Sequence, residues 1–339
     1  MKQLFTYIKY NIVPFLCLGA ILANLWLEMP SIVGAMLSLI GSIGLFYCAG
    51  LSVRRFGLIK NKWFASLAVV TVFIGLQSLV YFLFAINKET LSLLFAATFL
   101  LTIQTKQPRF RHRIKHEPYR FAHPDLLLVP IVLGYGLMIQ KLVAASTTLA
   151  LSSPLQLILP LFFALYGVVL LLLLMFVYQT KRHSVALAMT VMHFVLSLSV
   201  AAIVFQVGYG YDPFLHRAAQ QHILDFGAIF PKTPFYIGQY VTTISLVHLF
   251  HLPLKLVDIW LAPLLAAITL PLTTYVGMAR GFKVKKKWAR IAALLVPLYP
   301  LQMFIATTPH NLATLFTVLV VLLSPASLRF KDVRRFSGL

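Results

Sequence analysis

The chain has 339 residues, of which 60% are hydrophobic and only 11% are charged, and its formal net charge is +21. This composition excludes an ordinary water-soluble domain and predicts a membrane protein. The positive charge would also suit nucleic acid, but the basic residues fall in short clusters between apolar runs, as in the cytoplasmic loops of membrane proteins. No nucleic-acid partner is therefore expected.

Apolar runs that reach or approach the roughly 20 residues needed to cross a bilayer recur along the whole chain. They predict an all-α, polytopic transmembrane protein with about ten spans, the first of them a retained span and not a cleaved signal peptide. The runs cover approximately residues 12–27, 32–51, 64–86, 90–103, 126–146, 155–178, 185–206, 257–278, 291–306 and 312–323.

Basic clusters between the runs predict the orientation, because Lys and Arg are retained on the cytoplasmic side. Inside loops are expected at residues 54–62, 106–120, 181–182 and 279–290. An even number of apolar runs lies between each of these inside loops and the next. The first six runs therefore form three hairpins whose connecting turns lie outside. Both termini are then cytoplasmic, the membrane is expected to be the plasma (inner) membrane, and loop 207–256 lies outside.

The same count limits how the chain returns to the cytoplasm after this outer loop. An odd number of crossings must separate Tyr236 from the inside loop at 279–290, yet two apolar pieces are available, residues 236–250 and 257–278. The first piece is short and carries several polar side chains. It is therefore expected to be an interfacial or re-entrant helix and not a span.

The outer loop contains an amphipathic helix that is expected to begin at Asp212-Pro213 and to end at Gly227. A carboxylate accepts from the free N–H groups of a first helical turn, and proline tolerates that turn. The spacing predicts an apolar side and a polar stripe, formed respectively by Leu215, Ala219, Ile223 and Phe226 and by Asp212, His216 and Gln220, with Arg217 beside the stripe. A simple capped helix that connects two spans remains the alternative interpretation.

Lys232 follows this helix in the segment "PKTPFY". A carboxylate together with cations at the level of the lipid headgroups suits a reaction on a phosphate-bearing lipid.

The motif "YDPF" (Tyr211 to Phe214), directly after a predicted span, resembles the first outer loop of the GT-C superfamily of membrane glycosyltransferases. It is especially similar to the catalytic subunit of oligosaccharyltransferase. The resemblance covers about residues 185–323 and implies transfer of a sugar from a polyprenyl-phosphate-linked donor to an unspecified acceptor on the non-cytoplasmic face. It divides the chain into a six-span N-terminal region, 1–184, and a GT-C-like catalytic region, 185–339.

The resemblance implies that Asp212 is the catalytic carboxylate, either as a general base or as a ligand of a divalent metal such as Mg²⁺ or Mn²⁺. Asp225 is a weaker second metal candidate. The expected substrate contacts are His216, Arg217, Gln220, Lys232 and His310, of which Arg217, Lys232 and His310 supply positive charge for the phosphate.

Three features depart from the family pattern. Arg217 lies one residue nearer to the aspartate than the family's arginine, the Trp-Trp-Asp motif of oligosaccharyltransferase is absent from the sequence, and fewer spans follow the loop. They favour either a piece of a longer protein or a divergent relative. The alternative function is a membrane transporter or a lipid-handling subunit without catalytic activity.

Overall fold

The computed structural model describes residues 2–27, 31–55, 59, 61–103, 123–232, 234–296 and 302–327. Within these ranges the regular structure is helical, and extended pairing is confined to an isolated bridge between Thr147 and Phe205. Six of the described helices are long and apolar enough to cross a membrane, and three further apolar helices are shorter. The prediction of an all-α membrane protein is confirmed at this level.

The chain forms two compact units. One comprises Met1–Glu117 and His216–Val257, and the other comprises Pro118–Leu215 and Asp258–Leu339. This division follows internal packing, whereas the boundary predicted after residue 184 separates a catalytic region from the rest. That functional boundary stays a prediction.

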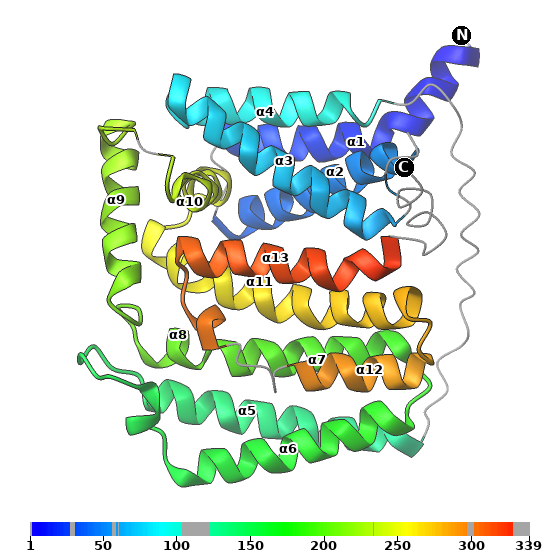
Figure 1. Cartoon of the computed structure of the whole chain (residues 1–339), viewed down its shortest axis with the longest axis vertical. Coiled ribbons are helices and arrows are strands. Elements are labelled where there is room, and N and C mark those ends of the chain that lie inside the picture. Colours follow the sequence, from blue (N-terminus) through cyan, green and yellow to red (C-terminus); the bar gives the residue numbers. More distant parts are fainter. Residues whose placement is uncertain are drawn as a thin grey trace, which may run out of the picture. The chain divides into compact units, whose positions relative to one another are not determined.

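In the first unit, four apolar helices lie side by side and a fifth crosses them (Figure 1). The four are α1 (Lys2–Leu27), α2 (Ser31–Arg55), α3 (Lys62–Leu83) and α4 (Lys88–Leu100). Helix α10 (Ile237–Phe250) is seen end-on in Figure 1, while α1 to α4 run across the view. Helix α10 has 14 residues, fewer than the roughly 20 that span a bilayer, and its interfacial or re-entrant position stays a prediction.

Buried polar contacts hold α10 against the other helices of its unit. The Asn24 side chain on α1 donates to the Leu249 carbonyl over 2.7 Å, and Gln77 on α3 donates to the Ser245 hydroxyl over 2.8 Å. Such contacts between helices are one of the forces that hold membrane bundles together, because lipid tails are as apolar as the helix surfaces. They fix α10, which in turn contacts helix α9 (Asp212–Phe226), the helix of the predicted outer loop.

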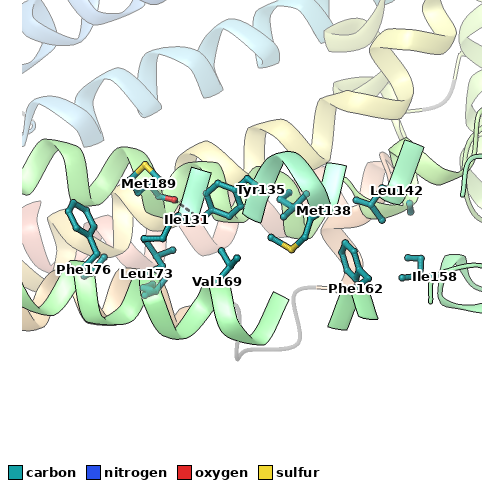
Figure 2. Packing of buried hydrophobic residues seen from close by; sticks show 14 of the residues in the cluster. Ile131, Tyr135, Met138, Leu142, Ile158, Phe162, Val169, Leu173, Phe176 and Met189 are labelled. Carbon is teal, nitrogen blue, oxygen red and sulfur yellow. Dashed lines mark hydrogen bonds between the residues drawn. The ribbon is translucent and has the colours of Figure 1, made fainter. Parts of the chain in front are cut away.

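The second unit is built around a cluster of apolar side chains between α5 (Leu128–Ala144), α6 (Pro160–Gln179) and α7 (His183–Leu198) (Figure 2). One face of α5 presents buried residues at helical spacing, namely Ile131, Tyr135, Met138 and Leu142. They meet Val169, Leu173 and Phe176 of α6. The Tyr135 hydroxyl also donates to the Met189 carbonyl of α7 over 3.5 Å.

The remaining helices of this unit are α8 (Val200–Val204), most of α11 (Leu254–Val276), the π-helical turn η3 (Gly277–Gly281), α12 (Lys286–Leu295) and α13 (Pro309–Ser327). Turn η3 packs tightly on α13. A Cβ atom on Gly277 would collide with the Leu322 carbonyl oxygen, and one on Gly281 would come within 2.6 Å of the Pro325 Cβ atom. Glycine is needed at Gly277 because the two backbones approach so closely.

Each of the ten predicted apolar runs contains a helix, but their lengths differ. Helix α4 has 13 residues and α12 has 10, both well short of the roughly 20 that span a bilayer. The described helices therefore support six spans by length and composition, and the count of ten is not reached on that criterion. The predicted inside loop at residues 106–120 lies outside the described residues.

Candidate functional site

The segment that leads to Asp212 is anchored on the loop between α5 and α6. Backbone hydrogen bonds join Thr147 to Val204 over 2.7 Å and to Gln206 over 3.1 Å, and the Tyr209 hydroxyl donates to the Ser152 carbonyl over 3.1 Å. These contacts lie just before the aspartate in the chain. They fix the point at which the outer-loop helix begins.

Helix α9 begins at Asp212, as predicted, and Gly227 follows its last residue. Gly210 and Gly227 have φ angles of 84° and 82°, in the left-handed region that favours glycine, so the chain turns sharply at both ends of the helix. The Asp212 side chain is exposed, and Pro213 occupies the first turn, where its missing N–H is tolerated. An exposed carboxylate at a fixed helix start is accessible to a substrate.

The expected faces of α9 are wrong in part. The predicted apolar side included Leu215 and Phe226, but their exposed fractions are 53% and 74%. The buried face instead contains His216 and Gln220 of the polar stripe, together with Ile223. His216 is buried because a polar partner on α10, Tyr240, forms a hydrogen bond with it and offsets the cost of burying a polar group. Amphipathic spacing predicts burial from hydrophobicity alone and does not reveal such a partner.

His216 is held against two tyrosines that precede or begin α10. Its Nδ1 atom lies 2.8 Å from the Tyr240 hydroxyl, and its ring packs edge-on against Tyr236 with 5.0 Å between ring centroids. Donor and acceptor in the first contact depend on the imidazole tautomer. His216 therefore joins α9 to α10, and its predicted role as a substrate contact stays a prediction.

Gln220 is a fully buried amide whose polar atoms are not satisfied by the described residues. Its exposed fraction is 0%, and neither Nε2 nor Oε1 has a hydrogen-bond partner among them. Gln239 on α10 is also buried, and its Oε1 atom likewise has no partner in the described part of the chain. Buried polar groups are nearly always hydrogen-bonded, so an unsatisfied amide indicates a place where a polar ligand or water completes the bonding.

Lys232 contacts the carboxyl end of α3. Its Nζ atom donates to the carbonyls of Tyr81 and Phe82 over 2.8 and 3.2 Å, and it lies 5.2 Å from the Tyr81 ring centroid. A cation at this position meets the last helical carbonyls and the negative end of the helix dipole. The sequence predicted a phosphate contact for Lys232, and this capping contact gives the residue a structural role that the sequence did not indicate.

We expect Lys232→Met to lower the stability of the protein by about 1 kcal/mol, because it removes the cation from the last carbonyls of α3. The measurement is thermal unfolding of the purified protein in one detergent. Lys255→Met is a control, since Lys255 is an exposed lysine of the same unit. Equal stability of the Lys232 variant and the control variant would contradict the capping role.

The other predicted site residues are spread over several surroundings. Arg217 is half-buried on α9, and His310 is exposed at the start of α13. Asp225 is exposed and accepts a hydrogen bond from Gln221 over 2.8 Å, one helical turn away. The described contacts bring His216 together with Tyr236 and Tyr240, but they do not bring all of the predicted site residues into one site.

A shared metal site for the two aspartates does not fit the geometry of α9. Asp212 and Asp225 lie 13 residues apart on one helix. At 1.5 Å per residue they are about 20 Å apart, so no single ion contacts both. Among the described residues, no three or more His, Cys, Asp or Glu side chains lie together in a way that could hold a metal ion. Because Mg²⁺ is often held by one or two carboxylates and substrate phosphates, metal binding at Asp212 stays a prediction.

The sequence did not indicate that Tyr240 and Tyr236 contact His216 on the buried face of α9. Both belong to the segment that was expected to be an interfacial or re-entrant helix, and polar residues in such a helix are a signal that it packs against protein. Nothing in their spacing indicated that His216 would be their partner.

Comparison with known proteins adds no relative. No family model matches the chain, and no curated protein and no solved structure matches it significantly.

Proposed function

We propose that this protein is a GT-C-like integral membrane glycosyltransferase. It transfers a sugar from a polyprenyl-phosphate-linked donor to an acceptor on the non-cytoplasmic face of the plasma membrane. The observation that carries the proposal is on α9, where exposed Asp212 is followed, one and two turns later, by buried His216 and by buried Gln220 with its unsatisfied amide.

The arrangement of α9 supports this chemistry in two ways. Asp212 stands at a fixed and exposed position, as a general base or a metal ligand requires. Gln220 offers both a donor and an acceptor in a buried setting, which matches the paired donor and acceptor character of sugar hydroxyl groups.

The proposed topology places about ten spans in the bilayer, with both termini cytoplasmic and loop 207–256 outside. Helix α10 lies along the outer surface of the first unit, and α9 is the amphipathic helix of that loop. The proposed count includes the short helices α4 and α12. The catalytic region is residues 185–339.

In the proposed reaction Asp212 accepts the proton of the acceptor's hydroxyl or amide group as its oxygen or nitrogen attacks the anomeric carbon. The bond from that carbon to the phosphate oxygen breaks, and polyprenyl phosphate leaves. Cations stabilise the leaving phosphate, and Arg217 and His310 are the candidates, together with Lys232 if it leaves its carbonyl partners. A divalent metal at Asp212 would supply further positive charge for the same phosphate.

The proposal is tested by adding polyprenyl-phosphate hexoses to the purified protein in nanodiscs, with a membrane extract as the source of acceptor. Mass spectrometry then measures free polyprenyl phosphate. A transporter or lipid-handling subunit would bind or move the donor and leave it intact. An enzyme would release polyprenyl phosphate with continued turnover.

A further inference from the structure

Two basic segments that are far apart in the sequence meet in the second unit. One is the start of α7 with Arg182 before it and His183 as its first residue, and the other is the start of α12. Helix α12 packs on both α6 and α7. The Lys287 Nζ atom lies 3.2 Å from the ring centroid of Tyr178, the residue that precedes the last residue of α6. Both segments are expected on the cytoplasmic side, where basic loops are retained.

Carboxylates neutralise little of this positive charge. Asp125 is buried and pairs with Arg182, with 2.9 Å between the Arg182 Nη1 and Asp125 Oδ2 atoms. Neither Lys286 nor Arg290 has a carboxylate within ion-pair distance in the part of the chain that the structure describes. The meeting point of the two segments therefore keeps a net positive charge.

Arg290 is a buried cation with unsatisfied hydrogen-bond donors. Its exposed fraction is only 3%, and its Nε and Nη1 atoms have no hydrogen-bond acceptor among the described residues. The buried Nδ1 atom of His183 is also without a partner there. Leaving the charged Arg290 donors buried and unpaired is strongly unfavourable, so an acceptor that is not part of these residues is expected.

His183 begins α7, and α7 packs on α12, which carries Arg290 and Lys286. His183 precedes the predicted span that begins at residue 185, and its pKa is lowered, first by burial and then by the positive charges of Arg290 and Lys286. Two packed helices therefore carry the unpaired donors of Arg290, the positive charge of Lys286 and the His183 Nδ1 atom, which is a donor in one tautomer. An acceptor that satisfies all of them must carry several oxygens and negative charge, and the planar fork of arginine suits phosphate in particular.

We propose that Arg290, His183 and Lys286 form a phosphate-binding site at the meeting point of the two basic segments. Its ligand is a phosphate group, either in the headgroup of an anionic phospholipid or as free phosphate. Tyr178 and Trp288 lie beside the site with 6.4 Å between their ring centroids, and such aromatic residues are enriched at membrane interfaces. The site is separate from the proposed glycosyltransferase site and does not depend on it.

The test measures thermal unfolding of the full chain in nanodiscs of phosphatidylcholine, with or without phosphatidic acid, and in detergent with or without inorganic phosphate. Phosphatidic acid is expected to raise the unfolding temperature of the wild type by about 3–6 °C. Arg290→Met and His183→Ala are expected to lose most of this increase. Lys181→Met removes an exposed charge of the same loop and is expected to keep it.

The outcomes separate the ligand sources. An increase with phosphatidic acid alone assigns a lipid headgroup, and an equal increase with inorganic phosphate assigns free phosphate. Arg290→Met removes a buried charge that has no partner, so this variant is expected to fold, and His183→Ala provides an independent reading. No increase with either ligand, or the same increase in the wild type and both site variants, would overturn the proposal.

Discussion

Replacing Asp212 with Asn is expected to lower the rate of sugar transfer by about 10²–10⁴-fold while the protein stays folded and inserted. The loss follows from the proposed role, because an amide neither accepts the acceptor's proton nor binds a divalent metal as strongly as a carboxylate. Folding is expected to persist because Asn caps helices about as well as Asp. The measurement is kcat for polyprenyl phosphate release, with unfolding temperature recorded for the same preparation.

Glu89→Gln is the matched control for this variant. Glu89 is an exposed acid in the first turn of α4, so its replacement also removes one carboxylate from a helix start. We expect the control to keep wild-type turnover. If Asp212→Asn turned over the donor at the wild-type rate, Asp212 would be a helix-capping residue and not the catalytic carboxylate.

Replacing Gln220 with Met is expected to change stability and donor binding in opposite directions. Methionine has a similar length and no polar group left without a partner, so the unliganded protein is expected to gain about 1–3 kcal/mol of stability. If the amide binds the donor, its loss is expected to raise KM by about tenfold or more. Thermal unfolding and initial-rate measurements on one preparation test both effects.

Gln221→Met is the control on the exposed side of the same helix. The Gln221 side chain is exposed, and its hydrogen bond to Asp225 lies at the surface, so its loss is expected to change stability by less than about 0.5 kcal/mol and KM not at all. A Gln220 variant that was less stable than the wild type and had an unchanged KM would show that the amide has a structural role only.

The apolar runs predicted where the helices lie, because apolar side chains are stable both inside a helical bundle and against lipid. Run length did not predict helix length everywhere, since α4 ends at Leu100 although its apolar run continues to residue 103. Polar side chains such as Gln77 interrupt the runs without ending the helices, because a partner on another helix satisfies them.

Charge counting predicted that residues 236–250 do not form a span. Helix α10 has 14 residues and crosses the neighbouring helices of its unit, and its position relative to the membrane stays a prediction. The start of α9 followed from Asp212 and Pro213, whose chemistry is local. Local chemistry of this kind is readable from sequence alone.

The sequence did not predict which side chains on different helices contact each other. The sequence placed His216 and Gln220 on a polar and exposed stripe, because helical spacing says nothing about a tyrosine on another helix. Lys232 was predicted to contact the donor phosphate, and its bonds to the end of α3 depend on a contact between residues about 150 positions apart. The unpaired donors of Arg290 likewise depend on packing that spacing does not encode.

The central claim, that Asp212 catalyses release of a sugar from a polyprenyl-phosphate donor, is tested most directly by one measurement. Free polyprenyl phosphate formed per mole of protein is followed over time for the wild type and Asp212→Asn in identical nanodiscs with the same membrane extract as the source of acceptor, after native mass spectrometry has established equal donor occupancy. We expect the wild type to release many equivalents and the variant to retain bound, intact donor. No release by the folded, donor-bound wild type, or equal release by both proteins, would contradict the account.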